Sequence, residues 1–181
     1  MPVLISLLRG VNVGGHRQVK MEDLRSIYES LGFKDVQTYI NSGNVLFKTV
    51  ARDPGRLRRR IEDAIESACG FRSDVVLRTP ADLKDVIDRN PFAARPDLDA
   101  RKLAIHFLAN EPNAEARRRA AAIDPSPEEL HVHARELYIY YTNGMARPKL
   151  SLTAIEKALQ TSGTSRNWNT VRKLLEMAGQ L

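Results

Sequence analysis

Cysteine is almost missing from this sequence: Cys69 is the only one among 181 residues. A single thiol excludes a disulfide framework within the chain, which is typical of a reducing compartment, so we expect a cytoplasmic protein. Cys69 follows Ala68 on an expected helix, where packing accounts for it, and nothing nearby in the sequence would lower its pKa. The sequence therefore predicts a structural thiol.

Long apolar runs are also missing. The apolar stretch at residues 3–8 is short, ends at Arg9 and follows no basic segment. We therefore expect neither a signal peptide nor a membrane span, and no membrane association. A compact apolar run of this length is typical of a buried strand.

The familiar nucleotide and catalytic motifs are absent as well. The loop from Gly10 to Gly15 has the spacing G-x-x-x-G-G, which matches neither the dinucleotide-binding fingerprint nor the Walker loop. No serine lies in a G-x-S-x-G elbow, and the carboxylates are scattered over expected helix faces. The sequence predicts no catalytic residue and no cofactor, and an enzyme would need residues that only the fold brings together.

The first half of the chain has a clear order of elements. Apolar and turn-forming residues predict strands at 3–8, 36–40, 45–47 and 74–78, with helices from Met21 to Gly32 and from Leu57 to Gly70. The turn residues 41–44 predict a hairpin between the middle strands. The resulting order, βαββαβ, predicts an antiparallel four-stranded sheet with both helices on one side.

The second half repeats much of this pattern. Thr79-Pro80 opens a short helix that ends at Asn90-Pro91, and residues 90–100 form a connection. Strands then follow at 103–108, 130–132 and 137–141, with helices at 114–123, 151–159 and 167–178. Thr153 and Glu156 have capping-box spacing. This half is βαββα with an extra helix.

The predicted fold class is α+β, with two ferredoxin-like halves of the βαββαβ type and an extra C-terminal helix. The expected domains are a ferredoxin-like half at 1–79, a helix and connection at 80–100, and a second ferredoxin-like half with the C-terminal helix at 101–181.

Three segments carry a family resemblance: Leu7–Gly15 (LLRGVNVGG), Thr38–Val45 (TYINSGNV) and Thr164–Thr170 (TSRNWNT). Together with Lys20-Met21 and Lys149-Leu150, they resemble the family catalogued as domain of unknown function 1697. The resemblance implies a bacterial-type cytosolic protein of two ferredoxin-like halves and implies no activity. Pro148 departs from the serine that commonly precedes the lysine, which puts a hydroxyl contact at that position in doubt.

Basic residues gather in loops without acids beside them, in a chain with 28 Lys and Arg, 22 Asp and Glu, and a net charge of +6. In the first loop, backbone N–H groups of a nest and three cations would attract an anion. The alternative is a flexible connection between strand and helix. The candidate residues of this loop are Arg9, Asn12, Gly14, Gly15, Arg17 and Lys20.

A second candidate anion site lies before the last helix. An uncapped helix N-terminus attracts anions, and Arg166 would add a fork of donors. The alternative is N-capping by Asn167 or Thr164, with Trp168 anchoring the helix. The candidate residues here are Lys149, Thr164, Arg166 and Asn167. We predict that Arg9, Lys20, Lys149 and Arg166 converge on one surface.

The hairpin near residue 135 suggests another surface. With Arg135-Glu136 as the turn, His133 would pair with Tyr138 and His131 with Tyr140, on one face of the sheet. This face could stack bases, or pack against the rest of the chain or a partner. Two histidines are too few for a metal site, and none is predicted.

The sequence favours a binding protein for a phosphate-bearing ligand, either a nucleotide or nucleic acid. An enzyme acting on a phosphorylated small molecule is the alternative, and a protein-interaction module using the His/Tyr face is a third. The oligomeric state is not indicated.

Overall fold

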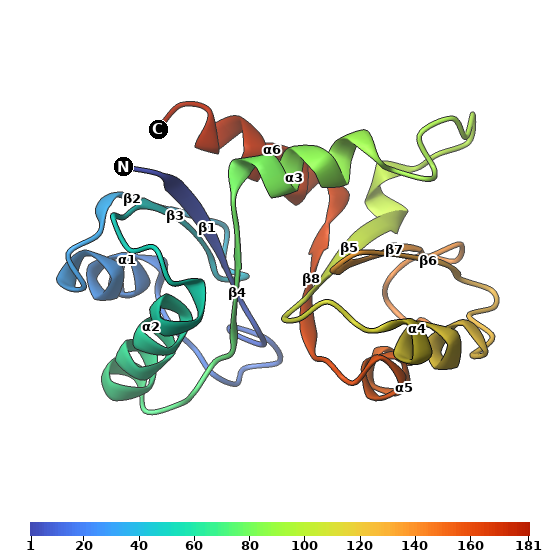
Figure 1. Cartoon of the computed structure of the whole chain (residues 1–181), viewed down its shortest axis with the longest axis horizontal. Coiled ribbons are helices and arrows are strands. Elements are labelled where there is room, and N and C mark those ends of the chain that lie inside the picture. The colour runs from blue at the N-terminus through green and yellow to red at the C-terminus, as the bar shows by residue number, and fades with distance from the viewer. The chain divides into compact units, whose positions relative to one another are not determined.

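The computed structural model describes residues 1–181, which form eight strands, six α-helices and one 3-10 turn at Ala100–Lys102 (Figure 1). The chain divides into two compact units, Met1–Lys84 with Lys173–Leu181, and Asp85–Arg172. Two helices, α3 (Pro80–Asp88) and α6 (Trp168–Ala178), contribute residues to both units. No helix is both long and apolar enough to cross a bilayer.

The first unit has the predicted βαββαβ order. Its elements are β1 (Val3–Leu8), α1 (Met21–Ser30), β2 (Lys34–Tyr39), β3 (Asn44–Lys48), α2 (Pro54–Cys69) and β4 (Val75–Arg78). They form one sheet in the order β2-β3-β1-β4, in which every neighbouring pair is antiparallel. The prediction for this half is confirmed.

Both helices of the first unit cover the same face of its sheet (Figure 1). Apolar residues of α1 and α2 share one core with the strands, and the aromatic rings of Tyr28, Phe33 and Phe47 meet at its centre. The Tyr28 hydroxyl lies 2.6 Å from Ser6 Oγ, so these two buried hydroxyl groups are hydrogen-bonded to each other. Burial raises the pKa of Tyr28 well above its ordinary value.

The second unit contains a strand that the sequence analysis missed. Its elements are β5 (Leu103–Leu108), α4 (Ala114–Ala121), β6 (Glu129–His133), β7 (Glu136–Tyr140), α5 (Leu152–Leu159) and β8 (Gly163–Asn167). The sheet order is β6-β7-β5-β8. Strand β8 has the polar sequence GTSRN, which carries no apolar alternation, and its pairing with β5 creates the strand.

With β8 included, the second unit is a complete βαββαβ motif. The two sheets also share their register: Ile5 pairs with Leu46 and Arg78, and Ile105 pairs with Tyr138 and Arg166. The predicted pair of ferredoxin-like halves is therefore correct, and the duplication extends to individual strand pairs.

The His/Tyr hairpin differs from its predicted register by two residues. The turn is Ala134-Arg135, so His131 pairs with Tyr138 and His133 with Glu136. Ala134 adopts the left-handed conformation that such a turn requires, with φ 47°. The register is shifted by an even number of residues, so each side chain stays on the face of the sheet that was predicted for it. His131, His133, Tyr138 and Tyr140 therefore lie on one face.

Helix starts follow local capping. The Asp82 carboxylate accepts the Thr79 N–H and Thr79 Oγ1 accepts the Asp82 N–H, which confirms the predicted start of α3 at Pro80. For α5, Ser151 is the N-cap and accepts the Ala154 N–H. The capping box expected for Thr153 and Glu156 is wrong, because the Glu156 side chain points instead to the sheet.

Candidate functional site

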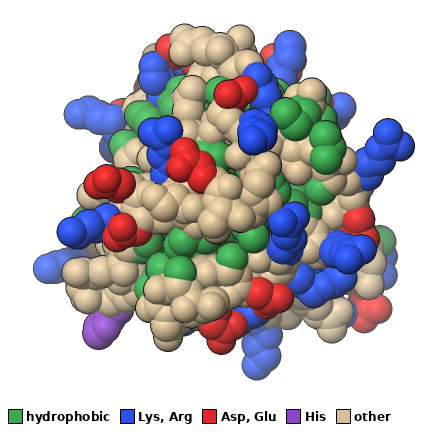
Figure 2. All heavy atoms as spheres, turned by 90° about the vertical axis from the view of Figure 1, so that its left-hand side faces the viewer, with side chains coloured by type: hydrophobic (Ala, Val, Ile, Leu, Met, Phe, Trp, Pro, Cys, Tyr) green, Lys and Arg blue, Asp and Glu red, His purple; other side chains and the backbone are tan.

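Basic and acidic side chains are mixed on the one face of the molecule that Figure 2 shows, and apolar side chains are visible between them. The net charge of +6 therefore has to be traced to particular groups of residues.

The long loop Arg9–Lys20 between β1 and α1 is organised by one side chain, Asn12. Its amide donates to Val19 O at 2.9 Å and to Asn41 O at 2.8 Å, and its Oδ1 accepts the Val19 N–H at 2.9 Å. The Asn12 N–H also donates to Arg17 O. One residue thus closes the loop at its base and ties it to the β2–β3 turn.

The β2–β3 turn packs directly on the start of this loop. Gly43 has φ 79°, and a Cβ there would lie 2.6 Å from Val11 Cγ2 and 2.8 Å from Leu8 Cβ. The Leu8 N–H donates to Gly43 O, and the Asn44 amide donates to Tyr39 O. Packing and hydrogen bonding therefore explain why the resembling segment Thr38–Val45 carries glycine and asparagine at these positions.

A groove of about 960 Å³ lies beside this loop and is called the α1 groove here. Its wall is formed by the loop, the β2–β3 turn, the first half of α1 and the end of α2. Its lining residues are Asn12, Gln18, Val19, Lys20, Met21, Asp23, Ser26, Ile27, Asn41, Ala68 and Cys69. Amides, one cation, one carboxylate and several apolar side chains thus face the same space.

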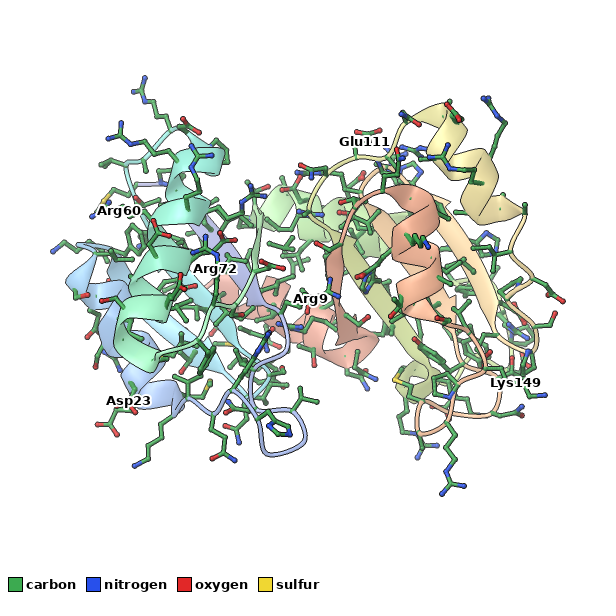
Figure 3. The ribbon with its side chains drawn as sticks, turned by 90° about the horizontal axis from the view of Figure 1, so that it is seen from below. Arg9, Asp23, Arg60, Arg72, Glu111 and Lys149 are labelled. Atoms are coloured by element: carbon green, nitrogen blue, oxygen red, sulfur yellow. The ribbon has the colours of Figure 1, made fainter.

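The N-terminus of α1 opens on this groove. Lys20 is the N-cap residue, is exposed, and its side chain makes no capping hydrogen bond. The first-turn N–H groups and the lysine ammonium favour an anion. Asp23 projects from the same turn (Figure 3) and supplies a hydrogen-bond acceptor. Desolvation raises the pKa of Cys69, which keeps this thiol protonated at neutral pH and agrees with its predicted structural role.

The tip of the loop is exposed. Gly14 and Gly15 have φ 58° and 77°, with nothing within 4 Å of a Cβ built on either. Arg17 is exposed as well, also with positive φ. Arg9 is half-buried, and its backbone carbonyl accepts from Ser73 Oγ. Of the candidate residues in the first loop, Asn12 and Lys20 line the α1 groove, whereas Arg9, Gly14, Gly15 and Arg17 do not.

The second predicted anion site has a different structure from the one expected. Arg166 lies on β8, is 5% exposed, and donates to Thr164 Oγ1 at 2.9 Å and to Ser165 O at 2.8 Å. Burial lowers the pKa of Arg166 to about 10, so the guanidinium stays protonated at neutral pH. Asn167 Oδ1 accepts the Asn169 N–H, which is the N-capping alternative.

Lys149 is exposed in the loop before α5. Its backbone N–H and that of Leu150 point to the buried carboxylate of Glu128, 3.4 and 3.0 Å away. Arg9 and Lys20 belong to the first unit, and Lys149 and Arg166 to the second. Their convergence on one surface stays a prediction.

The His/Tyr face is largely covered by the segment after α3. Phe92 contacts the rings of His131 and Tyr140, and the Arg95 guanidinium lies 4.6 Å from the Tyr140 ring centroid. The Tyr138 hydroxyl donates to Val86 O, and Tyr138 is 1% exposed. Only the histidines of this face are exposed, so intramolecular packing accounts for the tyrosines.

Sequence reasoning missed a polar network inside the second unit. His106 Nδ1 lies 2.8 Å from Ser165 Oγ, and His106 Nε2 lies 3.0 Å from Glu156 Oε1. The same Glu156 oxygen accepts the Gly163 N–H at 2.9 Å. His106 lies 50 residues before Glu156 and 59 before Ser165, so no local motif could reveal the network. The imidazole is 3% exposed, and the network links β5, β8 and α5.

Comparisons with known proteins agree with this fold. A family model described as a protein of unknown function, DUF1697, matches residues 1–138. The solved structure of the conserved bacterial protein SP0830 from Streptococcus pneumoniae is similar, with a TM-score of 0.70 and 22% identity over 98% of each chain. A search of curated proteins finds no match.

Proposed function

The chain belongs to the DUF1697 family of proteins of unknown function, and we propose that it binds a phosphate-bearing ligand in the α1 groove. The observation that carries the proposal is the start of α1. A helix of ten residues begins in the groove, and its N-cap, Lys20, brings positive charge instead of a capping oxygen. Open N–H groups next to an ammonium suit a phosphate.

The rest of the groove favours a ligand with more than a phosphate. Asp23 would repel a second phosphate but accept a hydrogen bond from a hydroxyl or amino group. Met21, Ala68 and Cys69 give the groove an apolar side. A phosphate, polar hydrogens and an apolar body occur together in a nucleotide, and about 960 Å³ is enough for one.

The backbone beside the groove supports a functional role. Ile40 is β-branched, yet it has φ 47° and is 48% exposed, immediately before the groove residue Asn41. Val13, on the loop that Asn12 ties to Asn41, is 65% exposed. A β-branched residue with positive φ is strained and costs stability, and such strain is concentrated at sites where a ligand is bound.

A thermal-shift screen of nucleoside monophosphates, sugar phosphates and inorganic phosphate tests the proposal. We expect nucleotides to raise Tm more than inorganic phosphate does. Lys20→Ala should weaken the best ligand by about tenfold or more, because it removes a charge-assisted hydrogen bond. Lys34→Ala is the matched control, since Lys34 is exposed on β2 and does not line the groove.

The proposal fails if no phosphate compound shifts Tm, or if Lys20→Ala and Lys34→Ala have the same effect. The enzyme alternative uses the same site. Incubating the bound nucleotide with the protein and looking for a product distinguishes the two, because a binding protein returns its ligand unchanged.

A further inference from the structure

We infer that the N-terminal end of α2 binds the sugar–phosphate backbone of nucleic acid, at a site separate from the α1 groove. Five arginines occur within nine residues, Arg52, Arg56, Arg58, Arg59 and Arg60. All except Arg58 are exposed, and these four are called the α2 arginine surface. Figure 3 shows Arg60 projecting from α2, with nitrogen-bearing side chains around it.

This surface differs from the rest of the molecule in its charge balance. Elsewhere, arginines commonly lie within 3 Å of a carboxylate, as in Arg25–Glu29, Arg89–Asp85 and Arg119–Glu115. Arg52, Arg56 and Arg59 are in no such pair. Like charges repel, so unpaired arginines on neighbouring turns are best stabilised by an external anion.

The single acid in the cluster is already engaged. Asp53 is the N-cap of α2, and its carboxylate accepts the Arg56 N–H at 3.0 Å. That hydrogen bond, with the charges of Arg59 and Arg56, lowers the pKa of Asp53. The negative charge of Asp53 offsets the charge of one of the four arginines. The positive end of the helix dipole adds to the positive charge of the other three.

The shape of the surface suits a chain of phosphates. Arg52, Arg56 and Arg60 line a groove of about 480 Å³ together with Asp53 and Leu57. Arg60 is held in place because it donates to Leu31 O and lies against the Phe33 ring. Residues four apart on a helix are separated by about 6 Å along its axis, so the guanidiniums can contact successive phosphates instead of one.

The residues around this surface argue against two other modes of binding, insertion into a membrane and recognition of specific bases. The apolar side chains of α2, Leu57, Ile61 and Ile65, are buried in the core and cannot enter a bilayer. Phe33 is 5% exposed beneath Arg60, so it cannot stack on a base. The expected binding is therefore independent of sequence, and its affinity falls steeply with salt.

Fluorescence anisotropy of the full chain with a labelled oligo-dT tests the inference at several salt concentrations. If four phosphates are contacted, log K should fall with log salt with a slope of about −3. Arg56→Ala with Arg59→Ala should weaken binding by about tenfold or more at low salt and reduce that slope by roughly 1.4. Arg25→Ala with Arg118→Ala removes the same charge from other exposed positions and should change affinity less than about twofold.

Three outcomes overturn the inference. They are no binding of oligo-dT at low salt, equal losses in the two double variants, and competition by poly-glutamate as effective as that by unlabelled oligo-dT. Circular dichroism spectra confirm that the variants fold, and alanine favours helix at these positions. Arg56→Ala with Arg59→Ala should leave the Tm shift caused by nucleotides unchanged, because neither residue lines the α1 groove, so this inference and the proposed nucleotide site succeed or fail separately.

Discussion

The two units share strand order and register, but the connection between their first strand and first helix differs. It is Arg9–Lys20 in the first unit and Ala109–Asn113 in the second, which is less than half as long. The second unit shows that this fold forms with the short connection. The fold therefore does not require the long loop, and long ordered loops on a rigid frame commonly carry function.

The second helix of each unit differs in the same way. Helix α2 has 16 residues and α5 has 8, and the α2 arginine surface lies on and just before the first two turns of α2. The duplicated fold thus serves as an internal control, and it distinguishes what the architecture needs from what the first unit has added.

One feature is common to both units. Glu62 of α2 accepts the N–H of Val75, the first residue of β4, at 3.0 Å, and Glu156 of α5 accepts that of Gly163, the first residue of β8. The surroundings differ, because Glu62 also pairs with Arg72, whereas Glu156 bonds to buried His106. The second helix and the last strand of each unit therefore make equivalent contacts, but the glutamate has different partners in the two units.

The largest effect is expected from removing these two glutamates, which we predict to be unequal in their contribution to stability. Glu156→Ala leaves the His106 and Gly163 N–H groups without their acceptor, and each buried unsatisfied donor costs about 1–3 kcal/mol. We expect a loss of about 2–5 kcal/mol, measured by urea denaturation. Glu62→Ala should cost less, because Arg72 keeps Asp63 and Glu66. Equal losses of unfolding free energy in the two variants would show that the hydrogen bond to the His106 imidazole adds nothing to stability.

Glycine substitutions sharpen the comparison between packed and open turns. Gly43→Ala places a methyl group against Leu8 and Val11 and forces positive φ on alanine, which should cost about 2–4 kcal/mol. Gly14→Ala meets no neighbour, so only the backbone term of about 1 kcal/mol applies. Thermal unfolding of both variants measures the difference. Similar values would contradict the close packing of the β2–β3 turn on the loop.

Shortening the long loop tests whether the fold needs it. Replacing residues 13–16 with Asn-Gly retains the hydrogen bond from Asn12 N–H to Arg17 O and makes the first connection resemble the second. We expect the free energy of unfolding to change by less than about 1 kcal/mol. Urea denaturation measures this free energy. A loss of several kcal/mol would show that the tip of the loop is needed for stability of the fold.

The smallest expected effect is the pH dependence of the α2 N-cap. The pKa of Asp53 is lowered in the folded state, so its contribution is present above the ordinary carboxyl pKa and lost as pH falls through the lowered value. Asp53→Asn keeps a capping oxygen that does not titrate. The Tm of the native chain should exceed that of the variant near neutral pH, and the difference should shrink as the pH falls below the ordinary carboxyl pKa. If the difference in Tm were the same at every pH, the negative charge of Asp53 could not be its cause.

Sequence patterns predicted most of the fold because apolar residues at regular spacing mark Val3–Leu8 and α2 clearly. They failed at β8, where the polar residues 163–167 become a strand only by pairing with β5. They singled out Asn12 and Lys20, which line the α1 groove, but they assigned Arg166 to a surface loop, although it is buried. The network of His106, Glu156 and Ser165 could not be predicted, because only tertiary structure brings these residues together.

The glutamate contacts at Val75 and Gly163 also bear on motion. The first residue of an edge strand normally frays, because its amide opens without disturbing the core. Here each of those amides is held by a carboxylate that a core helix carries, so the strand end can open only when the helix shifts as well. In each unit, the last strand and the second helix should therefore exchange their amide hydrogens as one cooperative unit, even though they are separate elements of the fold.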